Sequence, residues 1–190
     1  MSDKFQNKYR IASARLPGWN YGWNASYFIT ICTKDRECFF GEIVNGEMNL
    51  SKTGVIADLM WYEIKNHAKG VELDEFIVMP NHVHGIITLN GEDERPPTIL
   101  NANGDSNVET RHALSLPAQQ RFQNQGKNTI SSIVGGYKAA VTKHANRLKF
   151  DFAWQPRFHD HIIRDEQSFQ TISNYIINNA QNWSEDKFFK

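Results

Sequence analysis

Two histidines separated by one residue, His82-Val83-His84, are the side chains in this sequence best suited to hold a metal ion. They follow the turn pair Pro80-Asn81 and begin a stretch that reads as a strand, so both imidazoles should project from the same face. Two neutral ring nitrogens on one face can bind a divalent cation and leave coordination positions open. The same pattern also fits two solvent-facing polar residues on a half-buried strand.

A tyrosine and an asparagine farther along the chain could complete such a site. Tyr175 and Asn179 lie four residues apart, which places them on one flank of a helix. The Asn179 amide oxygen is a hard ligand suited to Mg²⁺ or Mn²⁺. The Tyr175 hydroxyl offers a chemical partner for the metal. The alternatives are a tyrosine that serves packing alone and an asparagine that is simply exposed.

The elements that must position these groups follow an α+β order. Strand patterns cover 26–34, 72–79, 82–89 and 155–164, and helical patterns cover 51–69, 128–149 and 165–181. The Asn45-Gly46 pair predicts a type I′ hairpin between two short apolar stretches. Without that hairpin and the segment 91–126, the order is β-α-β-β-α-β. This order predicts a ferredoxin-like or RRM-like split β-α-β antiparallel sheet with helices on one face and an extra C-terminal helix.

The spacing of apolar residues indicates which face each helix buries. In the first helix, the residues expected to be buried are Val55, Leu59, Tyr62 and Ile64. In the last helix, the residues expected to pack on the sheet are Phe169, Ile172, Ile176 and Trp183.

Composition limits the class of protein. The chain has 190 residues with 40% hydrophobic residues, which suits a single domain, 1–190, with a sizeable core. Two cysteines cannot form a disulfide framework. The sequence contains neither a signal-peptide pattern nor an apolar run long enough to span a membrane. We therefore expect a protein of a reducing, cytoplasmic compartment.

Charge is unevenly distributed although the net charge is zero. Residues 1–36 hold six basic and two acidic side chains, and residues 127–164 hold seven and two. Two basic blocks suit a groove for a short, shaped nucleic acid, and ordinary surface scatter explains the same counts equally well. Residues 1–25 form a basic and aromatic arm, and the polar stretch 91–126 is an insertion that we expect to be mobile.

Five stretches together resemble the REP-associated tyrosine transposases, the branch of single-tyrosine HUH transposases linked to repetitive extragenic palindromes in bacteria. They are YFITICT (27–33), MPNHVHGI (79–86), TISSIVGGYKAAVTK (129–143), WQPRFHDHIIRDE (154–166) and YIINNAQNW (175–183). The resemblance covers nearly the whole chain apart from 91–126, and five blocks in the right order make it specific. One position departs from the family pattern: Ala180 replaces the usual proline, which could let the last helix run on and shift Trp183.

The resemblance implies a role for each candidate. His82 and His84 would be the metal-binding pair, Asn179 a third ligand for Mg²⁺ or Mn²⁺, and Tyr175 the nucleophile on a catalytic C-terminal helix. The implied activity is metal-dependent cutting and rejoining of single-stranded DNA next to palindromic hairpins, through a 5′-phosphotyrosine intermediate. A tyrosine with an ordinary pKa of about 10 is protonated at neutral pH. The metal field could lower that pKa, or His161 could accept the proton, although a structural role suits His161 better.

Basic residues from both blocks are expected to hold the DNA. The candidates for phosphate contacts are Arg10, Arg15, Lys138, Lys143, Arg147, Arg157 and Arg164. Trp19 and Trp23 could stack unpaired bases beside the stem. The implied partner is single-stranded DNA with palindromic hairpins, met in the bacterial cytoplasm with association to the nucleoid when DNA is bound. A homodimer, in which Tyr175 serves the histidines of a partner subunit, stays open.

Three other classes are open from sequence. A catalytically inactive hairpin DNA-binding protein would keep the basic blocks and need neither metal nor tyrosine. An unrelated metal hydrolase on the same fold would need a further carboxylate or histidine beside the pair, and no motif marks one. Plasmid nickases and relaxases share the pair but are usually larger proteins. All catalytic positions except the proline are present, which favours the transposase-like enzyme.

Overall fold

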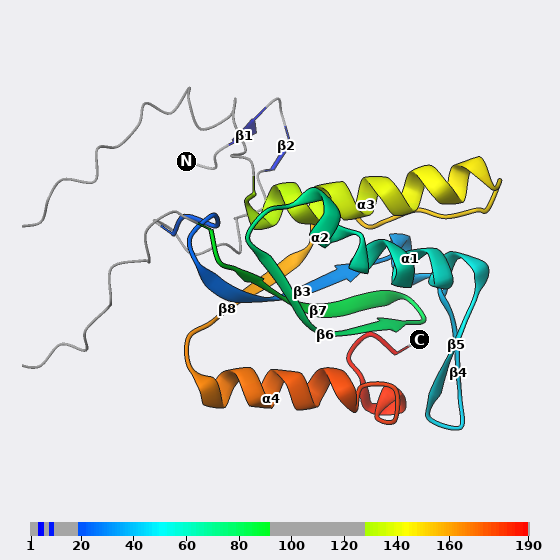
Figure 1. Ribbon diagram of the computed structural model, residues 1–190. Helices are drawn as coiled ribbons and strands as arrows, with labels where there is room; N and C mark the ends of the chain where they lie inside the picture. Colours follow the sequence, from blue (N-terminus) through cyan, green and yellow to red (C-terminus); the bar gives the residue numbers. More distant parts are fainter. Residues whose placement is uncertain (1–3, 6–7, 10–18, 92–127, 190) are drawn as a thin grey trace, which may run out of the picture.

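The computed structural model describes residues 4–5, 8–9, 19–91 and 128–189. The predicted DNA contacts Arg10 and Arg15 lie outside the described residues, as does the predicted insertion 91–126 apart from Gly91. Within the described residues, helices cover both faces of one central sheet (Figure 1). No helix in this part of the chain is long and apolar enough to cross a membrane.

Four antiparallel strands form the central sheet in the order β6-β7-β3-β8. They are β3 (Ala25–Cys32), β6 (Val71–Met79), β7 (His82–Leu89) and β8 (His159–Ile163). The first strand of the sheet in the chain, β3, lies between β7 and β8, which is the predicted split arrangement. The predicted α+β fold class is therefore confirmed.

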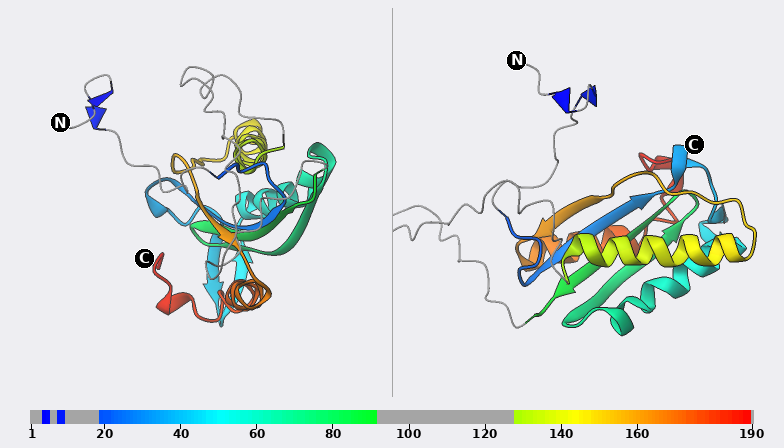
Figure 2. Two further views of the ribbon diagram at one scale, coloured as in Figure 1. Left: turned by 90° about the vertical axis from the view of Figure 1, so that its left-hand side faces the viewer. Right: turned by 90° about the horizontal axis from the view of Figure 1, so that it is seen from above.

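The helices are divided unequally between the two faces of the sheet. One face is covered by α1 (Lys52–Tyr62), α2 (Ile64–His67) and α3 (Ile130–Arg147), as Figure 2 shows. The other face carries α4 (Glu166–Ile177), the only α-helix there within the described residues (Figure 1). The smaller elements are β1 (Lys4–Phe5), β2 (Lys8–Tyr9), the hairpin β4 (Gly41–Val44) and β5 (Glu47–Leu50), and the 3₁₀ helices η1 (Lys34–Arg36) and η3 (Trp183–Glu185).

Alternation along the strands builds a separate apolar cluster on each face. The larger cluster joins the sheet to α1 and α3 and includes Tyr27, Ile29, Trp61, Val83, Ile87, Tyr137 and Val141. The smaller cluster lies under α4 and is formed by Ile86, Ile163 and Ile176 with Phe28, Phe169 and Ile172. Each fully buried large apolar side chain contributes about 1.5–3 kcal/mol, so the larger cluster carries most of the stability.

Local signals in the sequence fix where several elements begin and turn. Ser51, Thr129 and Asp165 cap α1, α3 and α4, each accepting a hydrogen bond from a backbone N–H of the first turn. In the β4–β5 hairpin, Asn45 and Gly46 have φ of 54° and 79°, as a type I′ turn requires. The predicted turn at Asn45-Gly46 is confirmed.

The buried face predicted over 51–69 is wrong for the residues of α1 and correct for Ile64, which is buried at the start of α2. Val55, Leu59 and Tyr62 are 44%, 56% and 60% exposed, and the helix instead buries Ala57 and Trp61. Both sets repeat with helical spacing, so periodicity alone could not separate them. The Trp61 indole decides the choice, because its ring stacks on Phe76 with centroids 4.3 Å apart and covers the backbone of β7.

Three predicted boundaries also differ. The helix predicted over 51–69 is broken between α1 and α2. The strand predicted over 155–164 is shorter, because Arg157 adopts a left-handed φ of 68° just before β8 begins. The last helix, predicted to reach 181, ends at Ile177.

Candidate active site

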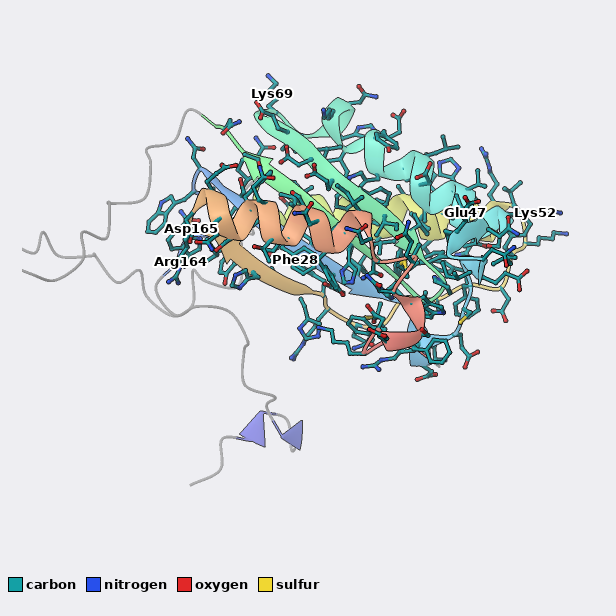
Figure 3. All side chains as sticks on the ribbon, turned by 90° about the horizontal axis from the view of Figure 1, so that it is seen from below. Phe28, Glu47, Lys52, Lys69, Arg164 and Asp165 are labelled. Carbon is teal, nitrogen blue, oxygen red and sulfur yellow. The ribbon has the colours of Figure 1, made fainter. Side chains whose placement is uncertain are left out.

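His82 and His84 lie on β7 and face α4, with 0% and 1% of their surface exposed. Their rings are 4.4 Å apart between centroids. Phe28, on the neighbouring strand β3, stacks on His84 with centroids 5.1 Å apart. In Figure 3, Phe28 lies between α4 and β8. The pair is therefore a buried cluster, and the interpretation of two solvent-facing polar residues does not hold.

His82 is held by the residue before it. Its Nδ1 lies 2.9 Å from Oδ1 of Asn81, while its Nε2 is buried and has no hydrogen-bond partner among the described residues. Burial lowers the pKa of His82 to about 3, with smaller contributions from Lys187 and Arg36. The imidazole is thus neutral at physiological pH, and its second nitrogen faces the site.

His84 connects the sheet to α4. Its Nδ1 lies 2.9 Å from the hydroxyl of Thr30, and its Nε2 lies 3.2 Å from the hydroxyl of Tyr175. Burial holds the pKa of His84 well below its ordinary value, and the neighbouring His82 acts in the same direction. A hydroxyl can donate or accept, so Thr30 can support either neutral tautomer of His84.

Tyr175 belongs to the last turn of α4 and is 40% exposed. Its hydroxyl donates a hydrogen bond to Oδ2 of Asp186 over 3.0 Å. Burial raises the pKa of Tyr175 to about 12, and the nearby negative charge of Asp186 raises it further. The hydroxyl is therefore protonated at neutral pH, with a carboxylate in position to take its proton. It reaches His84 of its own chain, an arrangement that the sequence had left open beside one in which Tyr175 serves a partner subunit.

Asn179 lies just beyond α4 and is 2% exposed. Its Nδ2 donates to Oδ2 of Asp186 over 3.2 Å, and its Oδ1 is buried without a partner among the described residues. The expectation that Ala180 lets the helix run on is wrong, because Asn178 already caps α4. Ending the helix there folds Asn179 back toward Asp186.

Asp186 is the residue of the site that the sequence interpretation missed. It follows η3 in the C-terminal segment, where its Oδ2 contacts both Tyr175 and Asn179 and its Oδ1 accepts a hydrogen bond from the backbone N–H of Phe188. No local pattern marks this aspartate. It lies outside the regular helix and reaches the site only because the chain turns back after α4.

The cluster fits a divalent cation. Ligand atoms of His82, His84 and Asp186 lie within 4.8 Å of one another. The unpartnered Nε2 of His82 and Oδ1 of Asn179 are two further reasons, because buried polar atoms normally have partners. Neutral imidazoles with carboxylate and amide oxygens form a donor set suited to Mn²⁺ or Mg²⁺. This donor set can hold a metal ion.

His161, which the sequence offered as an alternative proton acceptor although a structural role suited it better, does not contact Tyr175 among the contacts of the described residues. It is exposed on the edge strand β8, opposite Phe28 in the register. Cross-strand neighbours share a face, so His161 is on the same side of the sheet as the histidine pair. The groups in hydrogen-bond contact with the Tyr175 hydroxyl are Asp186 and His84.

The predicted DNA contacts are spread over the molecule. Lys138 already donates to the backbone carbonyls of Gln155 and Arg157, over 2.7 and 3.0 Å. Lys143 and Arg147 are exposed on α3, across the sheet from Tyr175.

Two further predicted contacts are exposed outside the helices. Arg157 lies in the turn before β8. Arg164 lies next to the N-cap of α4, at the end of that helix away from Tyr175 (Figure 3). The site and the predicted DNA contacts therefore do not form one compact cluster.

The aromatic part of the predicted arm packs against the domain. Trp19 donates its indole N–H to the hydroxyl of Tyr27 over 3.1 Å, and its ring meets Trp23 edge to face. These contacts leave less of Trp19 for stacking on bases than a free arm would offer.

Comparison with known proteins places the chain in a family. No protein-family model matches it. An uncharacterized protein of Haemophilus influenzae is 39% identical over 178 residues, which cover 93% of this chain and 92% of that protein. The chain belongs to the same family as this protein. The shared length means that the relationship extends over the whole domain.

A solved structure shares the fold of the present chain. It is a REP-associated tyrosine transposase bound to a REP hairpin, with a TM-score of 0.55 and 17% sequence identity, over 90% of this chain and 74% of that one. The likeness confirms the fold class, a four-stranded antiparallel sheet with helices on both faces.

Proposed function

We propose that the protein cuts and rejoins single-stranded DNA through a covalent tyrosine intermediate, as a metal-dependent strand transferase of the transposase type. The observation that carries the proposal is the meeting of a half-exposed phenol, two buried neutral imidazoles and one carboxylate. The Tyr175 hydroxyl lies 3.2 Å from His84 and 3.0 Å from Asp186. A phenol poised between a candidate metal ligand and a base suits nucleophilic attack on phosphorus.

In the proposed reaction the Tyr175 oxygen attacks the scissile phosphorus in line. A bond forms between that oxygen and phosphorus, the bond from phosphorus to the 3′ oxygen breaks, and the products are a 5′-phosphotyrosine and a free 3′ hydroxyl. The phenolic proton passes to the Asp186 carboxylate, and the departing 3′ oxygen takes up one proton from the surrounding water. A 3′ hydroxyl from the same or another strand reverses the step, so rejoining needs no ATP.

His82, His84 and Asp186 would hold the divalent cation, with the amide oxygen of Asn179 as a further ligand. A bound Mg²⁺ or Mn²⁺ supplies positive charge that polarises a non-bridging phosphate oxygen. The protein itself contributes the fixed ligand atoms, the aligned phenol and a buried setting in which these charges act strongly.

The proposed substrate is DNA that combines a single strand with a palindromic hairpin. The solved transposase of the same fold is bound to a REP hairpin. In the present chain, Lys143, Arg147 and Arg157 are exposed and could contact phosphates of a stem, while Arg164 could contact the strand that leads along α4. We place this activity in the bacterial cytoplasm, at the nucleoid.

Incubation with hairpin-bearing single-stranded oligonucleotides and Mn²⁺ or Mg²⁺ tests the proposal. Denaturing electrophoresis should show a protein–DNA adduct that Tyr175→Phe abolishes and that His82→Ala reduces by at least 100-fold. Tyr62→Phe is the matched control, because this exposed tyrosine lies on α1 across the sheet. An adduct that survives in Tyr175→Phe would refute the assignment of the nucleophile.

The same gel separates the proposal from a metal-dependent phosphodiester hydrolase. Such an enzyme needs a carboxylate beside the histidine pair, and Asp186 supplies one. A hydrolase uses water as nucleophile, so it would release cut DNA without an adduct, and Tyr175→Phe would still cut. Tight hairpin binding with neither adduct nor cut product in either metal would instead identify an inactive DNA-binding protein.

A further inference from the structure

Asn81 is fully buried beside the candidate metal ligands. It is the second residue of the two-residue turn between β6 and β7 and directly precedes His82. Its main-chain carbonyl accepts hydrogen bonds from the backbone N–H and the hydroxyl of Thr33. These bonds need no particular side chain at position 81, so the carboxamide is free for another task.

The carboxamide of Asn81 contacts three different parts of the chain. Its Nδ2 lies 2.8 Å from the carbonyl oxygen of Phe188 and 3.3 Å from that of Arg36. Its Oδ1 lies 2.9 Å from Nδ1 of His82. Because the two carbonyl oxygens can only accept, both amide hydrogens are donated to them. The amide oxygen is therefore an acceptor, and the proton of neutral His82 resides on Nδ1.

This hydrogen bond determines which nitrogen His82 presents to the site. With the proton on Nδ1, the lone pair is on Nε2, the buried atom that has no partner among the described residues. A metal ligand needs that lone pair, and a hydrogen bond to the other ring nitrogen fixes both the tautomer and the ring orientation.

The other side of the amide holds the segment that carries Asp186. Phe188, whose carbonyl Asn81 binds, donates its backbone N–H to Oδ1 of Asp186 over 2.7 Å. Arg36 also fixes the C-terminal segment. Its side chain donates to the carbonyl of Lys187, and its guanidinium lies 5.0 Å from the centre of the Phe188 ring. The second oxygen of Asp186 is left facing Tyr175 and Asn179.

The loop that supplies the Arg36 carbonyl is itself strained. Asp35 and Arg36 both have left-handed φ angles, 51° and 57°. Side-chain-bearing residues adopt this conformation at a cost in free energy. The conformation brings the Arg36 carbonyl within reach of Asn81.

We propose that Asn81 is the positioning residue that assembles the metal site from two distant parts of the chain, β7 and the C-terminal segment. Through Oδ1 it presents Nε2 of His82, and through Nδ2 it anchors the C-terminal segment that delivers Asp186. Asn81 touches neither substrate nor metal; it acts through these two residues. The inference rests on the proposed function for its metal and makes a separate claim about how the ligands are set.

Two measurements on the full chain test it. The first is ¹⁵N NMR of the imidazoles without metal, which reports the tautomer of His82. Wild type should show the Nδ1–H form, and Asn81→Ala should lose it. The second is Mn²⁺ binding followed by electron paramagnetic resonance. Loss of a hydrogen-bond partner behind a ligand typically weakens metal binding by about 10–100-fold, and we expect this range for Asn81→Ala.

Asn81→Asp separates the two halves of the claim and covers a failure of the alanine variant to fold. A carboxylate can still accept from Nδ1 of His82, so the tautomer should be kept. It cannot donate to the Phe188 carbonyl, so Mn²⁺ affinity should still fall. In an Asp186→Asn background the same change should weaken Mn²⁺ binding less, because Asp186 no longer contributes.

Tyr137→Phe is the matched control, since it removes a buried hydrogen bond to the Ala57 carbonyl on the other face of the sheet. Wild-type tautomer and Mn²⁺ affinity in folded Asn81→Ala would overturn the inference. Equal losses of affinity in Tyr137→Phe would also overturn it, because stability alone would then explain the effect. If wild type shows the Nδ1–H tautomer, Asn81→Ala loses it and wild type binds no Mn²⁺, the proposed function fails, whereas the hydrogen bond from His82 to Asn81 still determines the tautomer.

Discussion

The two faces of the sheet bury different kinds of side chain. Toward α1 and α3, β7 presents Val83 and Ile87, and the surrounding cluster is almost entirely apolar. Toward α4, the same strand presents His82 and His84, both buried and both polar. A polar group buried without partners costs free energy, commonly about 1–3 kcal/mol. The comparison teaches that the α1/α3 face stabilises the fold, whereas the polar groups buried under α4 lower the free energy of unfolding and form a site.

The largest expected effect separates stability from chemistry. Trp61→Ala on the α1/α3 face should lower the free energy of unfolding by about 3–5 kcal/mol, because it leaves a cavity against Phe76 and β7. Tyr175→Phe on the α4 face removes only the hydrogen bonds of one hydroxyl, so it should lower this free energy by about 0.5–1.5 kcal/mol while abolishing the DNA adduct. Urea unfolding of both variants measures the difference.

That result would be contradicted if Tyr175→Phe were as destabilising as Trp61→Ala. The phenol would then be part of the structural core, and its place beside His84 would lose its functional meaning.

A smaller effect is expected on β7, the strand that carries the histidine pair and also contributes to the larger apolar cluster. Gly85 lies between His84 and Ile86, and a Cβ there would collide with the Trp61 ring. Gly85→Ala should therefore cost about 1–3 kcal/mol through overpacking. Gly135→Ala is the matched control: the position is helical, a Cβ there meets nothing within 4 Å, and alanine should stabilise α3 by up to about 1 kcal/mol. Thermal unfolding would show shifts of opposite sign, and equal signs would refute the packing argument.

The buried histidines should make stability depend on pH. In the metal-free protein, burial lowers the pKa of His82 to about 3, whereas an unfolded histidine titrates at about 6.5. Between these values the unfolded state binds more protons, so the free energy of unfolding falls as the pH falls. The slope per histidine is at most about 1.4 kcal/mol per pH unit. Urea unfolding in EDTA from pH 7 to pH 4 measures it.

The control is His67→Asn, because His67 is exposed on α2. This variant should keep the wild-type slope, and His82→Asn should flatten it. A wild-type curve that is level across this range would mean that solvent reaches the imidazoles.

The smallest effect concerns the phenol itself. The pKa of Tyr175 is raised mainly by burial and next by the charge of Asp186. Asp186→Asn should therefore lower it from about 12 part of the way toward the ordinary value of about 10. ¹³C NMR of labelled tyrosine measures the titration without metal. Glu185→Gln, at a neighbouring exposed position, should leave the pKa of Tyr175 unchanged. An unchanged pKa in Asp186→Asn would show that the Asp186 carboxylate does not interact with the phenol.

The sequence predicted the parts of this molecule that short-range rules control. The strand pair around Pro80-Asn81 and the Asn45-Gly46 turn depend on residues a few positions apart. The meeting of His84 with Tyr175 was predicted only with the help of a family resemblance, because 91 positions separate them.

The errors arose where tertiary contacts choose between equal local patterns. Two apolar stripes of α1 have helical spacing, and the contact of Trp61 with Gly85 and Phe76 selects the buried one. Asp186 was missed because nothing around it in the sequence distinguishes a ligand from a surface aspartate. Its position depends on the turn after α4 and on the hold of Asn81 on Phe188.

The members of the site differ in how far solvent reaches them. Tyr175 is 40% exposed, whereas His82 and His84 are at 0% and 1%. A polynucleotide can therefore touch the phenol but not the two imidazoles beneath it. In the proposed reaction the cation would bind before the strand, and the bound strand would then slow its release. A chelator added before the DNA should accordingly prevent the reaction, whereas a chelator added after the DNA should stop it only slowly.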